Sequence, residues 1–174
     1  ARVDAEEGPD GRQVLRISGG RLGPAQCDLD VGNSGTGIRL LAGMLAGLGF
    51  ASTLDGDASI RRRPMGRVLE PLRAMGASVT GSGDGCALAP LTIDGGGLRG
   101  IEYRLPMASA QVKGCVLFAG LSADGPTTVV EDRPSRAHTE ELMAATGIDV
   151  ERTHGDGLDR VTVLPGRPTP FVHD

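Results

Sequence analysis

Two stretches of the chain carry apolar or small residues at almost every position, which predicts two helices that are buried on nearly all sides. They are residues 38–48 and residues 112–121, the second interrupted only by Lys113 near its start. A helix that is hydrophobic around most of its circumference belongs inside a domain. In residues 65–75 the apolar side chains instead form one stripe with charged residues opposite, which predicts an amphipathic helix at the surface.

This pattern occurs twice, at an offset of roughly 71–73 residues, and such an internal repeat indicates one structural unit used twice. Each copy continues from the buried helix into a β-rich run, an Arg-rich loop, an amphipathic helix that ends at Gly76 or Gly147, and two more strands. The strands that we expect are residues 51–54, 77–80 and 87–93 in one copy and 127–131, 148–152 and 160–164 in the next. The unit is therefore a β-α-β-α-β-β module, and the fold class is α/β, of the α+β type with buried helices.

We expect the whole chain to form one domain. Its boundaries are 1–31 for the tail of an incomplete earlier unit, 32–100 and 101–164 for two complete units, and 165–174 for a linker. The tail contains two expected strands, residues 14–18 and 27–31, and three prolines mark the linker. The chain begins with Ala rather than Met, and together with the incomplete unit this predicts a piece of a longer protein.

Composition narrows the possible functions. Of the 174 residues only 2% are aromatic and the net charge is −4, which excludes a stacking surface for single-stranded nucleic acid and disfavours binding to nucleic acid or anionic membranes. No run approaches the ~18 consecutive apolar residues of a membrane span. Cys27, Cys86 and Cys115 are too dispersed for a disulfide or metal framework, which indicates a reducing compartment. We therefore expect a cytoplasmic protein with no metal, no cofactor and no nucleic-acid or membrane partner.

The starts of the two buried helices are candidates for an anion site. Residues 33–37 read Asn-Ser-Gly-Thr-Gly, and Ser109, Ala110 and Gln111 occupy the matching place in the second copy. The first N–H groups of a helix lack intrahelical partners and carry partial positive charge, so they favour a negatively charged ligand. The alternative interpretation is that the hydroxyls at these starts only cap the helices.

Arginines precede the second helix of each unit. Residues 61–63 are all Arg in one copy, and Arg133 and Arg136 lie in the corresponding loop of the other. Arg presents its donors in a fixed fork that matches phosphate or carboxylate. Lys113 is the single lysine among 18 basic residues, so the chain is rich in Arg throughout. The number of arginines in a loop therefore does not indicate function, and only the position of an arginine does. The alternative is a solvated loop in an Arg-rich protein.

Four segments together resemble the 5-enolpyruvylshikimate-3-phosphate synthases, a family of enolpyruvyl transferases. They read GNSGTGIRLLAG, GDASIRRRPMGRVLEPLRAMGA, LPMASAQVKGCVLFAGL and SRAHTEEL, in the family's order. The resemblance implies an inside-out barrel of two similar domains with three β-α-β-α-β-β units each, of which this chain would form most of the N-terminal domain. It also implies transfer of the carboxyvinyl group of phosphoenolpyruvate to the 5-hydroxyl of shikimate 3-phosphate, in the pathway to aromatic amino acids.

The resemblance also implies which residues bind the two substrates. They are Ser109, Ala110, Gln111 and Arg136 for shikimate 3-phosphate and Gly35, Arg63 and Gln111 for phosphoenolpyruvate. The family's proton-transfer groups lie in the other domain, which this chain lacks, so we expect no catalytic residue here and no turnover by the chain alone. Glyphosate-tolerant members often carry Ala in place of Gly35, which implies a glyphosate-sensitive site. Ala137 replaces the Asp that usually follows Arg136 in the family, which removes a carboxylate from this loop.

Two alternatives stay open. The sister family that transfers enolpyruvyl to UDP-N-acetylglucosamine carries a reactive Cys where this chain has Ala58, which disfavours that assignment. The other alternative is a non-catalytic anion-binding or interaction domain, for which no response to shikimate 3-phosphate is expected. A histidine triad is disfavoured, because His138, His154 and His173 have no Ser or carboxylate partner at a suggestive spacing.

Overall fold

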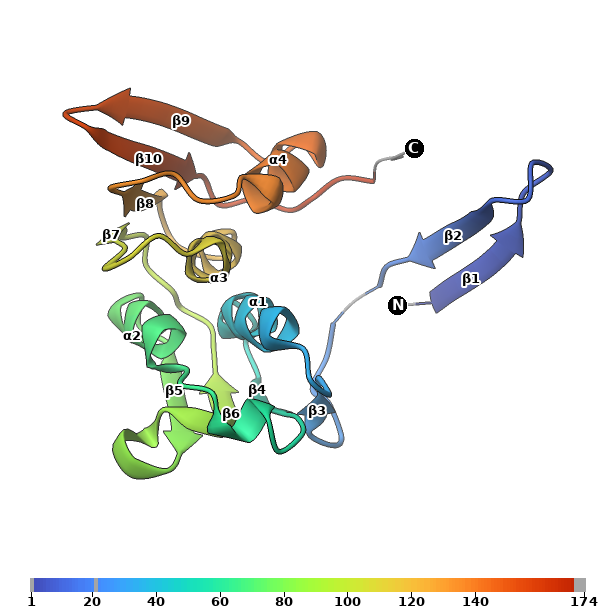
Figure 1. Cartoon of the computed structure of the whole chain (residues 1–174), viewed down its shortest axis with the longest axis horizontal. Helices are drawn as coiled ribbons and strands as arrows, with labels where there is room; N and C mark the ends of the chain where they lie inside the picture. The colour runs from blue at the N-terminus through green and yellow to red at the C-terminus, as the bar shows by residue number, and fades with distance from the viewer. Residues whose placement is uncertain (1, 21, 171–174) are drawn as a thin grey trace.

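The computed structural model describes residues 2–20 and 22–170, and two four-stranded sheets with helices between them form its main body (Figure 1). The strands of one sheet are β3 (Leu29–Asp30), β4 (Ala51–Asp55), β5 (Ser78–Ser82) and β6 (Leu88–Asp94). Those of the other are β7 (Glu102–Arg104), β8 (Thr127–Glu131), β9 (Val150–Gly155) and β10 (Leu158–Val163). The helices are α1 (Gly35–Ala46), α2 (Gly66–Ala74), α3 (Ala110–Gly120) and α4 (His138–Ala145), with short 3-10 helices at Ile60–Arg62 and Asp84–Cys86.

Both sheets have the same topology, with the strand orders β3-β4-β6-β5 and β7-β8-β10-β9. In each sheet the first strand runs parallel to the second, and the other pairs are antiparallel. This confirms the repeated β-α-β-α-β-β module and the fold class. Leu29 in β3 pairs with Leu54 in β4, so β3 lies in the sheet of the first complete unit, whereas the expected domain boundaries stay a prediction.

The elements follow the expected pattern closely, with differences at their ends. β8 covers the expected residues 127–131, whereas β1 and β7 fall outside the ranges that the pattern predicts. Helices α1 and α3 begin before residues 38 and 112, because hydroxyls cap them. The Oγ of Ser34 accepts the N–H of Gly37 at 2.9 Å, and the Oγ of Ser109 accepts the N–H of Val112 at 3.3 Å.

The two buried helices lie side by side between the sheets (Figure 1). Gly43 of α1 faces the backbone of Cys115 in α3 so closely that an added Cβ would overlap the Cys115 carbonyl. The Cys115 thiol is fully buried at this contact, and burial raises its pKa to about 12. One hydrophobic core spans both units, with Ile38 and Leu117 fully buried in it. Within residues 2–20 and 22–170 no helix is both long and apolar enough to cross a bilayer.

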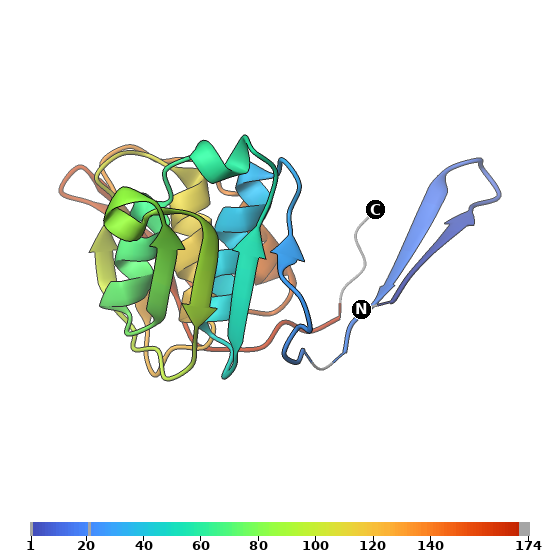
Figure 2. The ribbon, with the colours of Figure 1, turned by 90° about the horizontal axis from the view of Figure 1, so that it is seen from below.

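A hairpin of β1 (Arg2–Glu7) and β2 (Gln13–Ser18) stands apart from this body (Figures 1 and 2). None of the described residues of the hairpin is buried, and the apolar side chains of Val3, Leu15 and Ile17 are exposed. Residues 2–20 and 22–31 therefore add a separate small sheet and the strand β3 to the chain. Their assignment to an earlier unit stays a prediction.

The segment after β10 is tied to the second unit. The Gly166 N–H donates to the Leu121 carbonyl at 3.0 Å, and the Thr169 N–H donates to the Thr146 carbonyl at 2.8 Å. Residues 165–170 thus run along the body, while the end of the expected linker, residues 171–174, lies outside the described residues.

Candidate functional site

The start of α1 lies directly beneath an arginine. Gly35 is the first residue of the helix and is buried, and a Cβ added to it would lie 2.5 Å from Nη1 of Arg63. Only a residue without a side chain leaves this space free. The backbone of the helix start and the guanidinium group therefore lie close enough to contact one small anion together.

Arg63 is held in place by neutral partners. Its Nη2 donates to Oδ1 of Asn33 at 2.5 Å and to Oγ of Ser59 at 3.1 Å. The amide of Asn33 donates in turn to Oδ2 of Asp57 at 2.7 Å. Backbone hydrogen bonds, first from Ile60 and then from Ser59, help to hold the pKa of the Asp57 carboxyl below its usual value. The Arg63 charge also contributes to lowering this pKa, so the loop fixes the Arg63 side chain near Asp57 but without a direct ion pair.

The start of α3 is joined to the start of α1 through Gln111. Its Oε1 accepts from Nη1 of Arg39 at 2.9 Å, and its Nε2 donates to Oγ1 of Thr36 at 2.8 Å. Arg39 Nη1 also donates to the Gly35 carbonyl at 2.9 Å. The expected pairing of the two helix starts is therefore present in the structure. Arg39 was not among the expected site residues. It is a charged residue in a mostly apolar helix, and this feature of the sequence could have indicated it.

Three arginines concentrate positive charge beside these helix starts. The pKa of Arg39 is lowered, mainly because burial disfavours its charged form and further because Arg63 and Arg67 lie nearby. In the part of the chain that the structure describes, none of these three guanidinium groups forms an ion pair. Like charges held together without a direct ion pair are stabilised by a bound anion. The cluster is suited to phosphate or carboxylate.

A pocket opens between the starts of α2 and α3. Its polar lining comes from Arg39, Arg67, Ser109 and Gln111, and Met65 and Val112 are among its apolar lining residues. The first N–H groups of α3, including that of Ala110, have no partner within the helix. The expected contribution of Ala110 through its backbone stays a prediction, and its methyl group offers no polar contact.

The neighbouring Arg61 serves a different purpose. Its Nε and Nη2 donate to the two carboxylate oxygens of Asp55, at 2.9 and 2.5 Å. These hydrogen bonds are the main reason why the pKa of Asp55 lies below its usual value. Of the run 61–63, therefore, Arg63 faces the helix starts and Arg61 is already paired.

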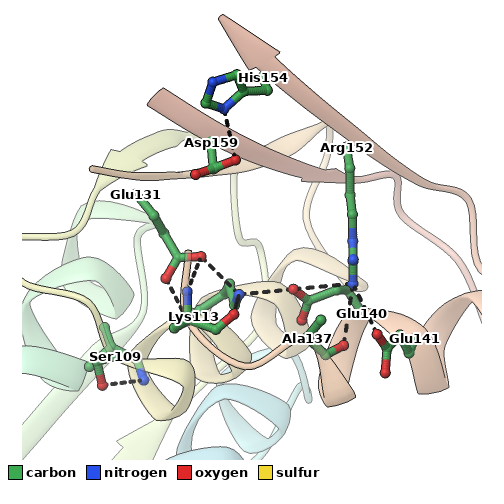
Figure 3. A network of polar contacts seen from close by, with 11 residues as sticks. Ser109, Lys113, Glu131, Ala137, Glu140, Glu141, Arg152, His154 and Asp159 are labelled. Atoms are coloured by element: carbon green, nitrogen blue, oxygen red, sulfur yellow. Dashed lines mark hydrogen bonds and ion pairs between the residues drawn. The ribbon is translucent and has the colours of Figure 1, made fainter. Parts of the chain in front are cut away.

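Arg136 is exposed on the loop between β8 and α4, and among the described residues no hydrogen bond or ion pair joins its side chain to Arg39 or Gln111. The loop itself is anchored to α3 by a buried ionic network around Lys113 (Figure 3). Glu131 and Glu140, the partners of Lys113, were not expected as site residues. The lone charged residue in an apolar helix was the sign of this network, but the sequence could not identify its partners.

Comparisons with known proteins agree on one family. A family model for EPSP synthase (3-phosphoshikimate 1-carboxyvinyltransferase) matches residues 3–170. Proteins named 3-phosphoshikimate 1-carboxyvinyltransferase from Acidithiobacillus ferrooxidans and Methylococcus capsulatus are 56% identical over 152 residues and 53% identical over 165 residues, which is 86% and 92% of this chain. A solved EPSP synthase from Acinetobacter baumannii superposes with a TM-score of 0.79 at 40% identity and covers 96% of this chain.

The same matches show that the chain is short relative to these proteins. It covers 34% and 36% of the two curated relatives and 37% of the solved structure. The chain thus spans about a third of their length.

Proposed function

The chain belongs to the EPSP synthase family, and we propose that it is the substrate-binding part of the N-terminal domain of a 3-phosphoshikimate 1-carboxyvinyltransferase. In this proposal the complete protein transfers the carboxyvinyl group of phosphoenolpyruvate to the 5-hydroxyl of shikimate 3-phosphate and releases phosphate. The observation that carries the proposal is the unpaired arginine cluster of Arg39, Arg63 and Arg67 beside two joined helix starts.

Charge and geometry support two adjoining subsites. Both substrates are polyanions, and they must be held in contact for the transfer to occur. We assign phosphoenolpyruvate to Gly35, Arg63 and Gln111, because Arg63 lies over the start of α1. We assign shikimate 3-phosphate to Ser109, Ala110, Gln111 and Arg136. Gln111 belongs to both subsites because its side chain joins the two helix starts.

The chain alone is proposed to bind and not to turn over. Arg39, Arg63, Ser109 and Gln111 supply hydrogen-bond donors, which orient anions and stabilise developing charge. The groups for proton transfer are proposed to come from the second domain of the enzyme, which would act as the partner of this chain. The glyphosate sensitivity expected from Gly35 stays a prediction for the complete protein.

A titration of the 15N-labelled chain with shikimate 3-phosphate tests the proposal. We expect the amide signals of Gly35, Ser109 and Gln111 to shift in a saturable manner. Arg63→Ala is expected to weaken the subsequent response to phosphoenolpyruvate by about 10- to 100-fold, the value of a hydrogen bond between charged groups. The matched control Arg99→Ala removes an exposed arginine after β6 and is expected to leave the response unchanged.

Titrations with two other ligands distinguish the proposed function from the alternative functions. Equal shifts with inorganic phosphate and shikimate 3-phosphate indicate a general anion-binding domain, and a response to UDP-N-acetylglucosamine indicates the sister enzyme. No shift at these amides with any of the three ligands contradicts the proposal, as does turnover by the purified chain.

A further inference from the structure

Lys113 is a charged residue inside an otherwise apolar helix. Its side chain is 2% exposed, and its two carboxylate partners, Glu131 and Glu140, are each 1% exposed. The distances from Nζ to Glu131 Oε2 and to Glu140 Oε1 are 2.8 and 2.9 Å. Removing three charges from water is costly, and apolar residues of the same size would often stabilise the fold as well or better. The network therefore calls for an explanation other than stability.

The network holds the residue that precedes Arg136. Nζ of Lys113 donates to the Ser135 carbonyl at 3.3 Å. Glu131 accepts the hydroxyl of Ser135 at 2.5 Å and its backbone N–H at 3.4 Å. The backbone and the side chain of Ser135 are thus both fixed by buried charges.

The residue that follows Arg136 is held from the other side. Nη2 of Arg152, in β9, donates to the Ala137 carbonyl at 3.4 Å and lies 3.4 Å from Oε1 of Glu140 (Figure 3). Both neighbours of Arg136 therefore connect to the same network, while the Arg136 side chain is exposed. The loop is fixed and its guanidinium group is left available.

The same helix carries Ser109 and Gln111. Lys113 lies one turn into α3, and its N–H donates to the Ser109 carbonyl at 2.9 Å. Four residues of helix span about 6 Å, so the network lies directly behind the first turn. A rigid helix thus connects the anion-binding start of α3 to the Arg136 loop.

We propose that the buried network of Lys113, Glu131 and Glu140 positions the loop 133–137, through Ser135, so that Arg136 and the start of α3 bind one phosphorylated ligand together. This inference rests on the proposed function, since it concerns the shikimate 3-phosphate subsite. Its physical basis is preorganisation, because a loop that is already ordered loses less conformational entropy on binding. Lys113 is a positioning residue, and it acts through Ser135 and Arg136 rather than on the ligand.

Ser135→Ala tests the inference, because it removes the hydroxyl that donates to Glu131, the shortest of the three hydrogen bonds between Ser135 and the network, while Lys113 and both carboxylates keep their pairing. We expect the dissociation constant for shikimate 3-phosphate to rise about three- to tenfold, which corresponds to the value of one hydrogen bond. The melting temperature is expected to fall by a few degrees, because Oε1 of the buried Glu131 loses its hydroxyl partner. Ser82→Ala is the matched control, because the Ser82 hydroxyl also donates to a backbone carbonyl, that of Ala89, at 2.7 Å, but in the other unit. It is expected to leave the dissociation constant unchanged.

A double-mutant cycle shows whether the effect passes through Arg136. In the Arg136→Ala background, Ser135→Ala is expected to change the dissociation constant by less than about twofold, because the loop then has no guanidinium group to position. The full effect of Ser135→Ala in that background overturns the inference. A second readout needs no ligand: hydrogen exchange of the residue-135 amide is expected to accelerate in Ser135→Ala, and unchanged exchange also overturns the inference.

Failure of the proposed function gives a different result. In that case the unmodified chain does not bind shikimate 3-phosphate, or Arg136→Ala binds it equally well, and the role assigned to the network falls with the subsite. If the Arg136→Ala variant is weakened but Ser135→Ala binds like the unmodified chain, only the inference is wrong.

Discussion

At the scale of single residues, the contacts of an arginine determine what it can do. Arg61 and Arg63 are separated by one residue, yet Arg61 donates to both oxygens of Asp55 while Arg63 donates to the neutral groups of Asn33 and Ser59. A guanidinium group that is already paired with a carboxylate attracts a further anion only weakly. An oriented group without an ion pair attracts that anion more strongly. The functional importance of an arginine in this Arg-rich chain is therefore set by what its neighbours leave unsatisfied.

Gly35→Ala tests how closely Arg63 and the start of α1 must approach each other. The added Cβ would lie 2.5 Å from Nη1 of Arg63, so the guanidinium group must move away. We expect the affinity for phosphoenolpyruvate, measured by NMR titration, to fall about 10- to 100-fold because one charged hydrogen bond is lost. Shikimate 3-phosphate should bind nearly as before, since Ser109 and Ala110 are untouched.

Gly49→Ala serves as the control for this substitution, because a Cβ at that position has nothing within 4 Å. It is expected to leave both affinities unchanged. Unaltered phosphoenolpyruvate binding by Gly35→Ala would show that Arg63 does not share an anion with the helix start.

At the scale of secondary-structure elements, the site depends on how closely α1 and α3 approach. Gly43 provides this contact, because its lack of a side chain lets the helix lie against the Cys115 backbone. One turn earlier, on the same side of the molecule, Arg39 meets Gln111. The helix packing and the hydrogen bonds between the helix starts are thus parts of one interface.

Gly43→Ala is expected to force these helices apart. Overpacking of a well-filled core costs about 1–3 kcal/mol, and we expect a loss of this size in the free energy of unfolding measured with urea. Gly66→Ala is the matched control in α2, because its nearest neighbour would lie at an ordinary 3.8 Å. That variant should change stability by less than about 1 kcal/mol, in the stabilising direction, since Ala favours helix more than Gly does. Equal stability of Gly43→Ala and the unmodified chain would contradict the close contact.

At the scale of the whole molecule, the two units share one core while the hairpin of β1 and β2 lies outside it. The two strands of the hairpin pair with each other in an antiparallel register, in which Val3 lies opposite Ile17 and Ala5 opposite Leu15. None of its described residues contributes to the core. The folding of the two units is therefore expected to be independent of the hairpin.

A chain that starts at residue 22 tests this independence. We expect its melting temperature to differ by less than about 3 °C, because no buried apolar surface is removed. The amide signals of the two units and their response to shikimate 3-phosphate should be preserved. Substantial unfolding of the shortened chain would show that the hairpin supports the units.

The repeat explains why much of the fold was predictable. Hydrophobic period and internal repetition are local properties, and they located β8, the two buried helices and the matched helix starts. The resemblance added roles for Ser109, Gln111 and Arg63 that spacing alone leaves open. Arg39 and Glu131 were missed because their importance comes from partners that lie 72 and 18 residues away along the chain.

The sequence by itself determined the repeated unit, the burial of its first helix and the family, since each is recorded in the order and period of the residues. Only the tertiary structure decided which charges are paired and which are left for a ligand. Residue type and spacing do not distinguish Arg61 from Arg63, and they mark Lys113 only as a charged residue in a mostly apolar helix. Pairing depends on distances between segments that meet only after folding, because electrostatic energy varies with separation and burial rather than with position along the chain.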